Sequence, residues 1–139
     1  MGGIDREHGH SEEVPAAEKM KTASNARLMF VMAANETQAA AIARTLVEER
    51  LAACVNMLGP VRSIYRWRDA VEDERECLML IKTAARLCGK VERRVKELHS
   101  YEVPEVMAVR FASGSADYLN WLFESVAPQK RRPRAGAQR

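Results

Sequence analysis

The feature that most constrains the fold is a long β-rich stretch from residue 53 to residue 83, which reads ACVNMLGPVRSIYRWRDAVEDERECLMLIKT. Two segments rich in strand-forming residues, Ala52 to Arg68 and Val71 to Thr83, meet at Asp69 and Ala70, which is typical of a β-hairpin. Gly59-Pro60 interrupts the first segment, and we expect a β-bulge there because a bulge bends a strand without ending its pairing.

The two arms of this predicted hairpin are long for a chain of this size. Strands in globular proteins usually have about 3 to 10 residues, and a strand of 16 residues would span about 50 Å. A domain of 100 residues, with a radius of gyration near 13 Å, is only about 34 Å across. We therefore expect the hairpin to extend beyond its own domain.

The distal part of the hairpin carries Ile64, Tyr65 and Trp67. Leaving such side chains in water would forfeit roughly 1.5 to 3 kcal/mol each. The sequence therefore predicts an obligate homo-oligomer in which neighbouring copies cover the hairpin. The alternative is that Gly59-Pro60 divides the first arm into two ordinary strands that fold back on one domain.

The remaining segments alternate between strand and helix patterns. In chain order we expect a strand at 27–33, a helix at 37–51 capped by Asn35, a helix at 85–98, a strand at 105–113 and a short helix at 114–126. The second of these helices must stop before Val103-Pro104. The order predicts an α+β fold, a ferredoxin-like βαββαβ sandwich with an extended hairpin and a C-terminal helix.

Composition sets the domain boundaries and the expected compartment. With 139 residues and 47% hydrophobic content, the chain holds one domain, which we place at 26–127. It lies between a flexible N-terminal extension at 1–25 and a basic flexible tail at 128–139, which has five basic groups and no acidic ones. Three cysteines without a C-x-x-C pair, and the lack of a signal peptide or an apolar run of membrane length, predict a cytoplasmic protein.

Several short motifs carry a family resemblance. CVN followed by SIYRW, then EREC and LMLIKT, then HSYEVPE and YLNWL, resembles the CutA divalent-cation-tolerance proteins in order and spacing over residues 27 to 126. The resemblance implies a compact homotrimer of ferredoxin-like subunits, similar in architecture to the PII nitrogen-signalling proteins, with clefts between the subunits. It also implies a response to divalent metal ions, with copper as the first candidate.

This sequence departs from the family pattern at four positions. Ser100 stands where the family usually has proline, and Asp69 stands where the hairpin turn usually has glycine. Asp tolerates left-handed backbone better than most residues, so the turn is preserved. Met32 and Leu98 occupy positions where some copper-linked bacterial members have a thiol and a second histidine, which weakens the copper interpretation.

The HSYEVPE segment holds the candidate metal ligands. His99 follows a predicted helix, whose negative C-terminal end favours a proton or a metal ion. We predict weak binding of a divalent cation, copper or zinc, by His99, Glu102 and Glu105, with adjacent chains supplying further ligands. The alternative is that these residues form hydrogen bonds in a turn or a subunit interface.

A second set of residues is predicted to line an intersubunit pocket or interface. Tyr and Trp side chains combine an apolar ring with a polar O–H or N–H group, and a lysine ammonium group can bind an anion. These residues are Tyr65, Trp67, Lys82, Tyr101, Pro104 and Trp121. Cys54 alternates with Val55 and Met57, and we expect it to be a buried thiol.

The predicted function is that of a homotrimeric binding or scaffold protein, metal-responsive or specific for a small ligand. The sequence shows no nucleophile with its base, no phosphate loop and no complete metal-ligand set, so we expect no enzyme. The alternative is an RNA-binding ferredoxin-like module that uses the basic tail. ECLMLIKT lacks the stacking aromatics of such a module, so we expect neither a nucleic acid nor a membrane as partner.

Overall fold

The computed structural model describes residues 22–129. The elements in chain order are β1 (Ala26–Ala33), α2 (Glu36–Glu48), β2 (Cys54–Trp67), β3 (Ala70–Ala84), the short 3-10 helix η1 (Ala85–Leu87), α3 (Cys88–Leu98), β4 (Val106–Arg110) and α4 (Ala116–Ser125). The strands form one sheet in the order β2-β3-β1-β4, and every neighbouring pair is antiparallel. The predicted α+β ferredoxin-like order is thus confirmed.

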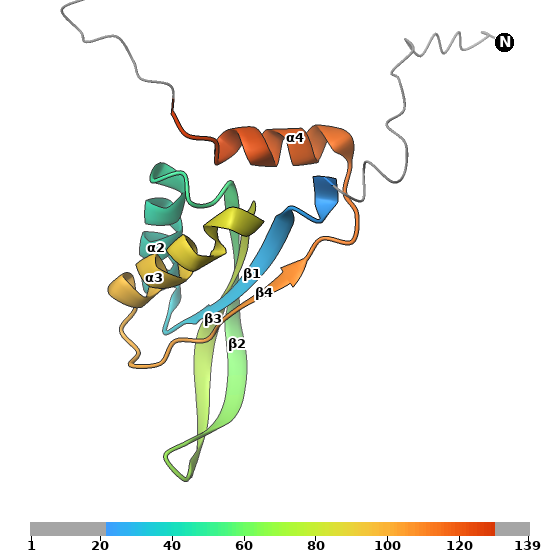
Figure 1. Ribbon diagram of the computed structural model, residues 1–139. Helices are drawn as coiled ribbons and strands as arrows, with labels where there is room; N and C mark the ends of the chain where they lie inside the picture. Colours follow the sequence, from blue (N-terminus) through green and yellow to red (C-terminus); the bar gives the residue numbers. More distant parts are fainter. Residues whose placement is uncertain (1–21, 130–139) are drawn as a thin grey trace, which may run out of the picture.

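Helices α2 and α3 lie side by side over one face of the sheet (Figure 1). The apolar positions of the helices meet alternate residues of the two central strands, and all of these side chains are buried. They are Met29, Val31, Met79 and Ile81 from the sheet, with Ile42, Leu46, Val91 and Val95 from the helices. Helix α2 begins as predicted, because Asn35 Oδ1 accepts a hydrogen bond of 2.8 Å from the Gln38 backbone N–H.

A second buried cluster lies where α4 crosses the end of the sheet (Figure 1). Leu119 and Leu122 of α4 pack there with Ala26 and Ala84, which are paired across β1 and β3. Ala23, which precedes β1, is also buried in this cluster. The helix starts at Ser115, whose hydroxyl accepts from the Tyr118 backbone N–H.

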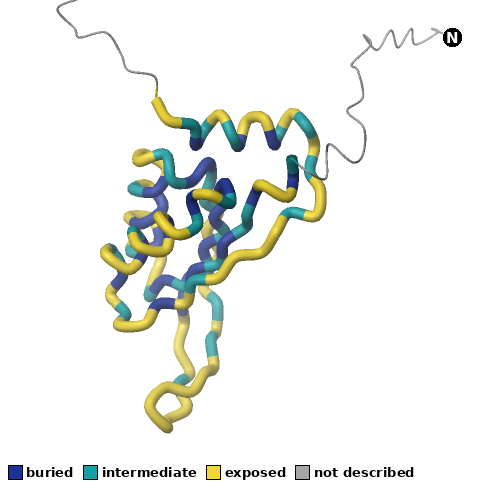
Figure 2. The backbone as a smooth tube through the Cα atoms, in the orientation of Figure 1, coloured by how far each residue is buried: buried dark blue, intermediate teal, exposed yellow. Residues whose placement is uncertain are grey.

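The hairpin of β2 and β3 reaches well beyond the rest of the molecule, and its outer half is almost entirely exposed (Figure 2). Ile64 at 64% and Trp67 at 38% exposure are far from a single-chain core. Its two-residue turn places Arg68 and Asp69 at positive φ, of 48° and 66°, as the common two-residue hairpin turns require. Within one chain the hairpin therefore overhangs, as the strand lengths predict.

A one-residue shift at Gly59-Pro60 determines which side chains share a face of the hairpin. Leu58 pairs with Leu78, but the next aligned pair is Val61 with Glu76, so β2 holds one extra residue, which confirms the predicted bulge. A shift of one residue moves every later side chain of a strand to the opposite face. The bulge thereby places Tyr65 and Trp67 on the same face as the even-numbered residues of β3.

The face of the sheet opposite α2 and α3, which we call the open face, is apolar over the central strands. Paired positions there are half-buried or exposed, with Met107 at 52% exposure. They include Leu28, Phe30, Leu58, Leu78, Leu80, Met107 and Val109. Within residues 22–129, no helix is long and apolar enough to span a membrane.

Candidate functional site

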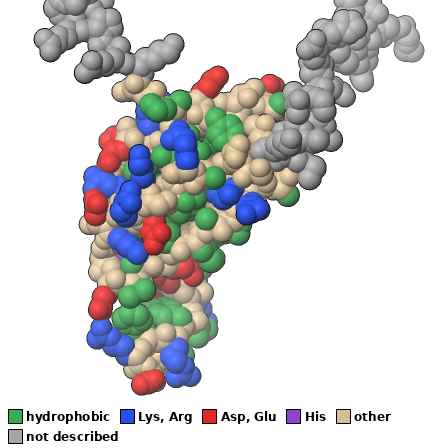
Figure 3. Space-filling model, in the orientation of Figure 1, with side chains coloured by type: hydrophobic (Ala, Val, Ile, Leu, Met, Phe, Trp, Pro, Cys, Tyr) green, Lys and Arg blue, Asp and Glu red, His purple; other side chains and the backbone are tan. Residues whose placement is uncertain are grey.

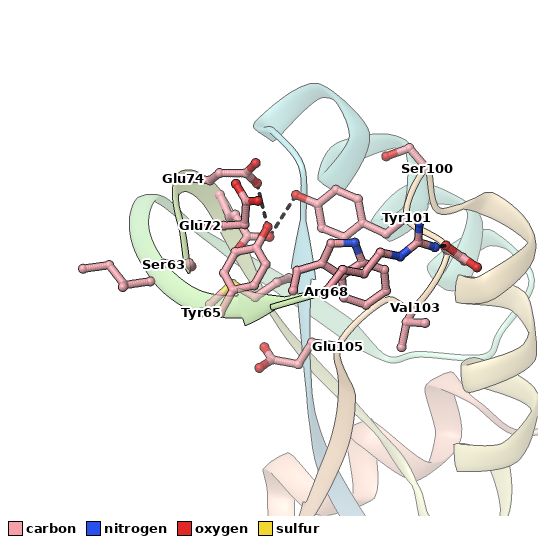
Figure 4. Close-up of a pocket in the computed structure, with 14 residues that line it drawn as sticks. Ser63, Tyr65, Arg68, Glu72, Glu74, Ser100, Tyr101, Val103 and Glu105 are labelled. Atoms are coloured by element: carbon pink, nitrogen blue, oxygen red, sulfur yellow. Dashed lines mark hydrogen bonds and ion pairs between the residues drawn. The ribbon is translucent and has the colours of Figure 1, made fainter. Parts of the chain in front are cut away.

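A groove of about 750 Å³ lies between the hairpin and the segment that joins α3 to β4. One wall comes from β2, β3 and their turn, and the other comes from residues 100–105 (Figure 4). The lining residues are Met32, Ser63, Ile64, Tyr65, Trp67, Arg68, Glu72, Glu74, Glu76, Ser100, Tyr101, Glu102, Val103 and Glu105. Its volume falls in the usual range for small-molecule sites, about 300 to 1,000 Å³.

The groove is strongly acidic. Glu72, Glu74 and Glu76 alternate along β3, so they project from one face of the strand. Glu102 and Glu105 stand on the opposite wall, and Arg68 is the only basic residue of the lining. Five carboxylates against one guanidinium create a negative potential that attracts cations.

Two tyrosines from opposite walls direct their hydroxyls toward the carboxylates (Figure 4). Tyr65 donates a hydrogen bond of 2.8 Å to Glu74, and Tyr101 donates one of 3.0 Å to Glu76, which is only 7% exposed. The bond to Glu74 is the main cause that raises the pKa of Tyr65 to about 12. Burial, followed by the bond to Glu76, also raises the pKa of Tyr101. Both phenols are therefore neutral donors at ordinary pH.

His99 lies beneath the groove and fixes the local course of the chain. Its Nε2 lies 2.7 Å from the backbone oxygen of Met32, and its Nδ1 accepts from the Tyr101 backbone N–H at 3.0 Å. These two bonds require the neutral tautomer with the proton on Nε2. The imidazole is 9% exposed, and its ring centroid is 4.6 Å from that of Tyr101. In this arrangement neither ring nitrogen has a free lone pair for a metal ion.

Arg68 bridges the two walls at the tip of the hairpin. Its Nη2 lies 2.7 Å from Oε2 of Glu102, and its Cζ lies 5.3 Å from the centroid of the Trp67 ring. Figure 4 shows the Arg68 side chain extending from the hairpin toward the Val103 segment. Both partners of the ion pair are about 70% exposed, so the pair is weak and readily exchanged.

The structure thus brings some of the predicted metal ligands to one groove. Glu102 and Glu105 line it, while His99 is held below by its two hydrogen bonds. Over residues 22–129, no three His, Cys, Asp or Glu side chains stand close enough to hold a metal ion on their own. Metal binding by this trio stays a prediction, and a single chain does not complete the site.

The predicted interface residues are divided among several places. Tyr65, Trp67 and Tyr101 line the groove, while Pro104 is buried outside its lining. Trp121 is exposed on α4, where its ring centroid lies 5.6 Å from that of Tyr118, with the two rings tilted by 37°.

Lys82 lies on the open face away from the glutamates of the 99–105 turn. Its ammonium group donates to the side-chain oxygen of Asn56 and stands 3.9 Å from the Cys54 sulfur. Cys54 is half-exposed on this face, so the expectation of a buried thiol is wrong. The reason is that its neighbour Val55 takes the core-facing position of β2.

Sequence reasoning missed Arg68 and the acidic residues of β3. Glu72, Glu74 and Glu76 follow an i, i+2 pattern that the sequence displays openly. The pattern gives their common face, but it does not reveal that the 100–105 segment lies opposite. The missing information was the position of the 100–105 segment, which the bonds of His99 to Met32 and Tyr101 determine.

The structure is an α+β ferredoxin-like domain with an overhanging hairpin and an acidic groove, and the comparisons with known proteins narrow this class. The family model described as CutA1 divalent ion tolerance protein matches residues 27–125. The chain belongs to this family. The "Divalent-cation tolerance protein CutA" of Thermus thermophilus is 45% identical over 98 residues, which cover 70% of this chain and 95% of that protein.

Solved structures of the family agree with this fold. A Thermus thermophilus structure titled as a divalent cation tolerance protein has a TM-score of 0.71 at 43% identity, covering 73% of this chain and 99% of that one. CutA of Xylella fastidiosa has a TM-score of 0.73 at 38% identity, covering 75% of this chain and 100% of that one.

The names of some relatives state a cellular location. An Arabidopsis thaliana relative at 35% identity is named chloroplastic, and the chain spans 63% of its length. An Archaeoglobus fulgidus structure at 32% identity is titled periplasmic, so the cytoplasmic location of this chain stays a prediction.

Proposed function

We propose that the protein is a homotrimeric binding protein of the divalent-cation-tolerance type, in which the groove of each chain takes up cations weakly. The observation that carries this proposal is the charge of the groove, five carboxylates against one guanidinium. The side-chain carboxylates of Glu72 and Glu105 make no hydrogen bond or ion pair with another described residue, so their oxygens are available to a cation. We propose binding as the role of the groove, and the expectation that the protein is no enzyme stays a prediction.

Trimer formation is supported by what one chain leaves uncovered. Strands β2 and β4 are the two edges of the sheet, and the overhanging part of β2 has no partner on its outer side. Such edges invite pairing with another chain, and a closed ring of copies satisfies them without open-ended growth. The apolar open face offers the surface that such copies would bury. A groove bordered by the overhanging hairpin then stands next to a neighbouring subunit, which is able to contribute the missing ligands.

The chemistry of the groove favours particular ions. Carboxylate oxygens suit hard ions such as manganese, magnesium and calcium, whereas imidazole and thiolate ligands suit copper and zinc. With both nitrogens of His99 engaged, the ligands that the described groove offers are oxygen atoms, apart from the thioether of Met32. The copper and zinc preference predicted from sequence requires His99 to release a hydrogen bond, so we propose oxygen-based, weak divalent binding.

Isothermal titration calorimetry tests this proposal with Mn²⁺, Zn²⁺ and Cu²⁺ on wild type, Glu105→Gln and Glu48→Gln. Glu105 lines the groove, whereas Glu48 is exposed on α2 and serves as the matched control. We expect Glu105→Gln to weaken binding severalfold and Glu48→Gln to leave it unchanged. Equal isotherms for all three proteins, or no heat at all, would contradict a cation site in the groove.

The RNA-binding alternative gains no support from the described residues. The part of β3 that would carry stacking aromatic rings, from Glu76 to Thr83, contains none. The basic residues from 130 onward lie outside the described part of the chain.

A further inference from the structure

The groove has three properties that a bare metal ion would not use. Its volume of about 750 Å³ is far larger than an ion. Its carboxylates are spread along two walls, and no three potential ligands of the described chain cluster closely. Its walls also carry the rings of Tyr65, Trp67 and Tyr101. Separated carboxylates with aromatic faces between them match a ligand that is itself extended, apolar in part and positively charged.

Arg68 shows which cation the walls accept. Its guanidinium group stands over the Trp67 ring and contacts the Glu102 carboxylate at the same time. Guanidinium is planar and weakly hydrated, so it stacks on aromatic rings while its N–H groups bind carboxylates. An exposed ion pair contributes little stability. The same two partners are therefore open to exchange with a guanidinium that arrives from outside.

We propose that the groove binds an organic cation bearing a guanidinium group, and that Arg68 is an intrachain occupant which such a ligand displaces. This inference rests on the proposed function, because it names the ligand class of the same groove. The ligand would place its cationic head on Trp67 and Glu102 and its alkyl part along the aromatic rings. The carboxylates of Glu72 and Glu105, which have no hydrogen bond or ion pair in the described chain, would meet a second positive group where the ligand carries one.

The turn that holds Arg68 permits a clean substitution. Arg68 adopts positive φ, a backbone conformation that Asn adopts more readily than Arg. Arg68→Asn should therefore keep the hairpin turn. Arg66 provides the control, because it pairs with Val71 on the opposite face of the hairpin, away from the groove. Arg66→Asn removes the same charge from the same hairpin. Comparing the two variants separates occupancy of the site from the general effect of net charge.

Calorimetry at low ionic strength with butylguanidinium and butylurea tests the proposal, since the two probes share their shape and differ in charge. We expect wild type to bind butylguanidinium and not butylurea. Arg68→Asn should bind butylguanidinium about five- to tenfold more tightly, and Arg66→Asn should change the affinity less than about twofold. Trp67→Leu should weaken butylguanidinium about five- to tenfold while the affinity for Mn²⁺ stays the same. Light scattering on this variant checks that its oligomeric state is unchanged.

Three outcomes would overturn the inference. If wild type and Arg68→Asn both bind Mn²⁺ but not butylguanidinium, the inference that the groove binds an organic cation is wrong. The proposed function, weak cation binding, would remain supported. Equal effects of Arg68→Asn and Arg66→Asn would show that Arg68 is not an occupant. Equal binding of butylurea would show that the groove does not select charge. Failure of Mn²⁺ and butylguanidinium together would overturn the proposed function itself.

Discussion

His99 and Met32 are 67 positions apart in the chain, and a hydrogen bond of 2.7 Å joins the Nε2 of the histidine to the backbone oxygen of the methionine. The bond ties the end of α3 to the end of β1 on the side where the groove opens. Because Nδ1 of the same ring accepts from the Tyr101 N–H, one side chain positions the whole wall formed by residues 100–105. His99 therefore has a structural role in the site that does not depend on metal binding.

Replacing His99 by alanine should therefore lower the free energy of unfolding. The change leaves the Met32 oxygen and the Tyr101 N–H without their partner, and we expect a loss of about 1 to 3 kcal/mol in urea unfolding. Lys96→Ala, an exposed change on α3 that removes an ion pair with Glu92, should stay within about 0.5 kcal/mol of wild type. If His99→Ala and Lys96→Ala were equally stable, the two hydrogen bonds would not hold the wall.

The tyrosines should ionise at a higher pH in the folded protein than in the unfolded chain. The chain has three tyrosines, and the pKa of each is raised: Tyr65 mainly by its bond to Glu74, and Tyr101 and Tyr118 mainly by burial. Ultraviolet titration should show no tyrosine ionising at the ordinary value near pH 10. Glu74→Gln should return one ionisation toward that value, and Glu48→Gln should not. A wild-type titration with one tyrosine ionising normally would contradict this assignment.

The same shifts predict how stability depends on alkaline pH. A pKa that is higher in the folded chain than in the unfolded one means that the folded chain holds the proton more tightly. For Tyr65 this contribution to stability is complete below about pH 10 and is lost as the pH rises through about 12. Tyr65→Phe should therefore reduce the fall in stability over this interval, as measured by urea unfolding at successive pH values. A fall as steep as that of wild type would show that Tyr65 does not contribute.

Charging the open face should dissociate the oligomer without unfolding the chain. Met107 is 52% exposed on the open face and Val47 is 43% exposed on α2, so Glu at either position is tolerated within one chain. We expect Met107→Glu to produce a folded species of lower mass in light scattering, with its circular dichroism retained. Val47→Glu should keep the wild-type mass. Equal masses for both variants and wild type would place the subunit interface elsewhere.

The order of elements and their fold were predictable because they depend on local patterns. The short apolar run RLMFVMA, the capping Asn35 and the 3.6-residue spacing of Leu87, Val91, Val95 and Leu98 are each contained in a short stretch of sequence. The Gly59-Pro60 bulge and the two-residue turn were equally local, and both are present. The turn consists of Arg68 and Asp69, one residue earlier than the predicted Asp69 and Ala70. The observed helix and strand ends differ from the predicted ones by a few residues, as with β4, which ends at Arg110 and not at Ser113.

The site was predictable only in part because it depends on register and on distant segments. Tyr65, Trp67, Tyr101, Glu102 and Glu105 were candidates and do meet in the groove. Tyr65 shares a face with Glu74 only because of the one-residue shift at the bulge. Tyr101 meets Glu76 because the distant 100–105 segment lies opposite β3. The engagement of His99 with Met32 depends on how α3 ends against β1, which no pattern within either element records.

The most direct test of the account is the mass of the protein in solution, measured by light scattering at low micromolar concentration. In the proposed trimer, neighbouring copies would cover the overhanging hairpin, the apolar open face and the edges of the sheet. The account predicts a mass near three times the chain mass of 15.6 kDa, unchanged on dilution. A mass near that of one chain, with the protein folded, would contradict it.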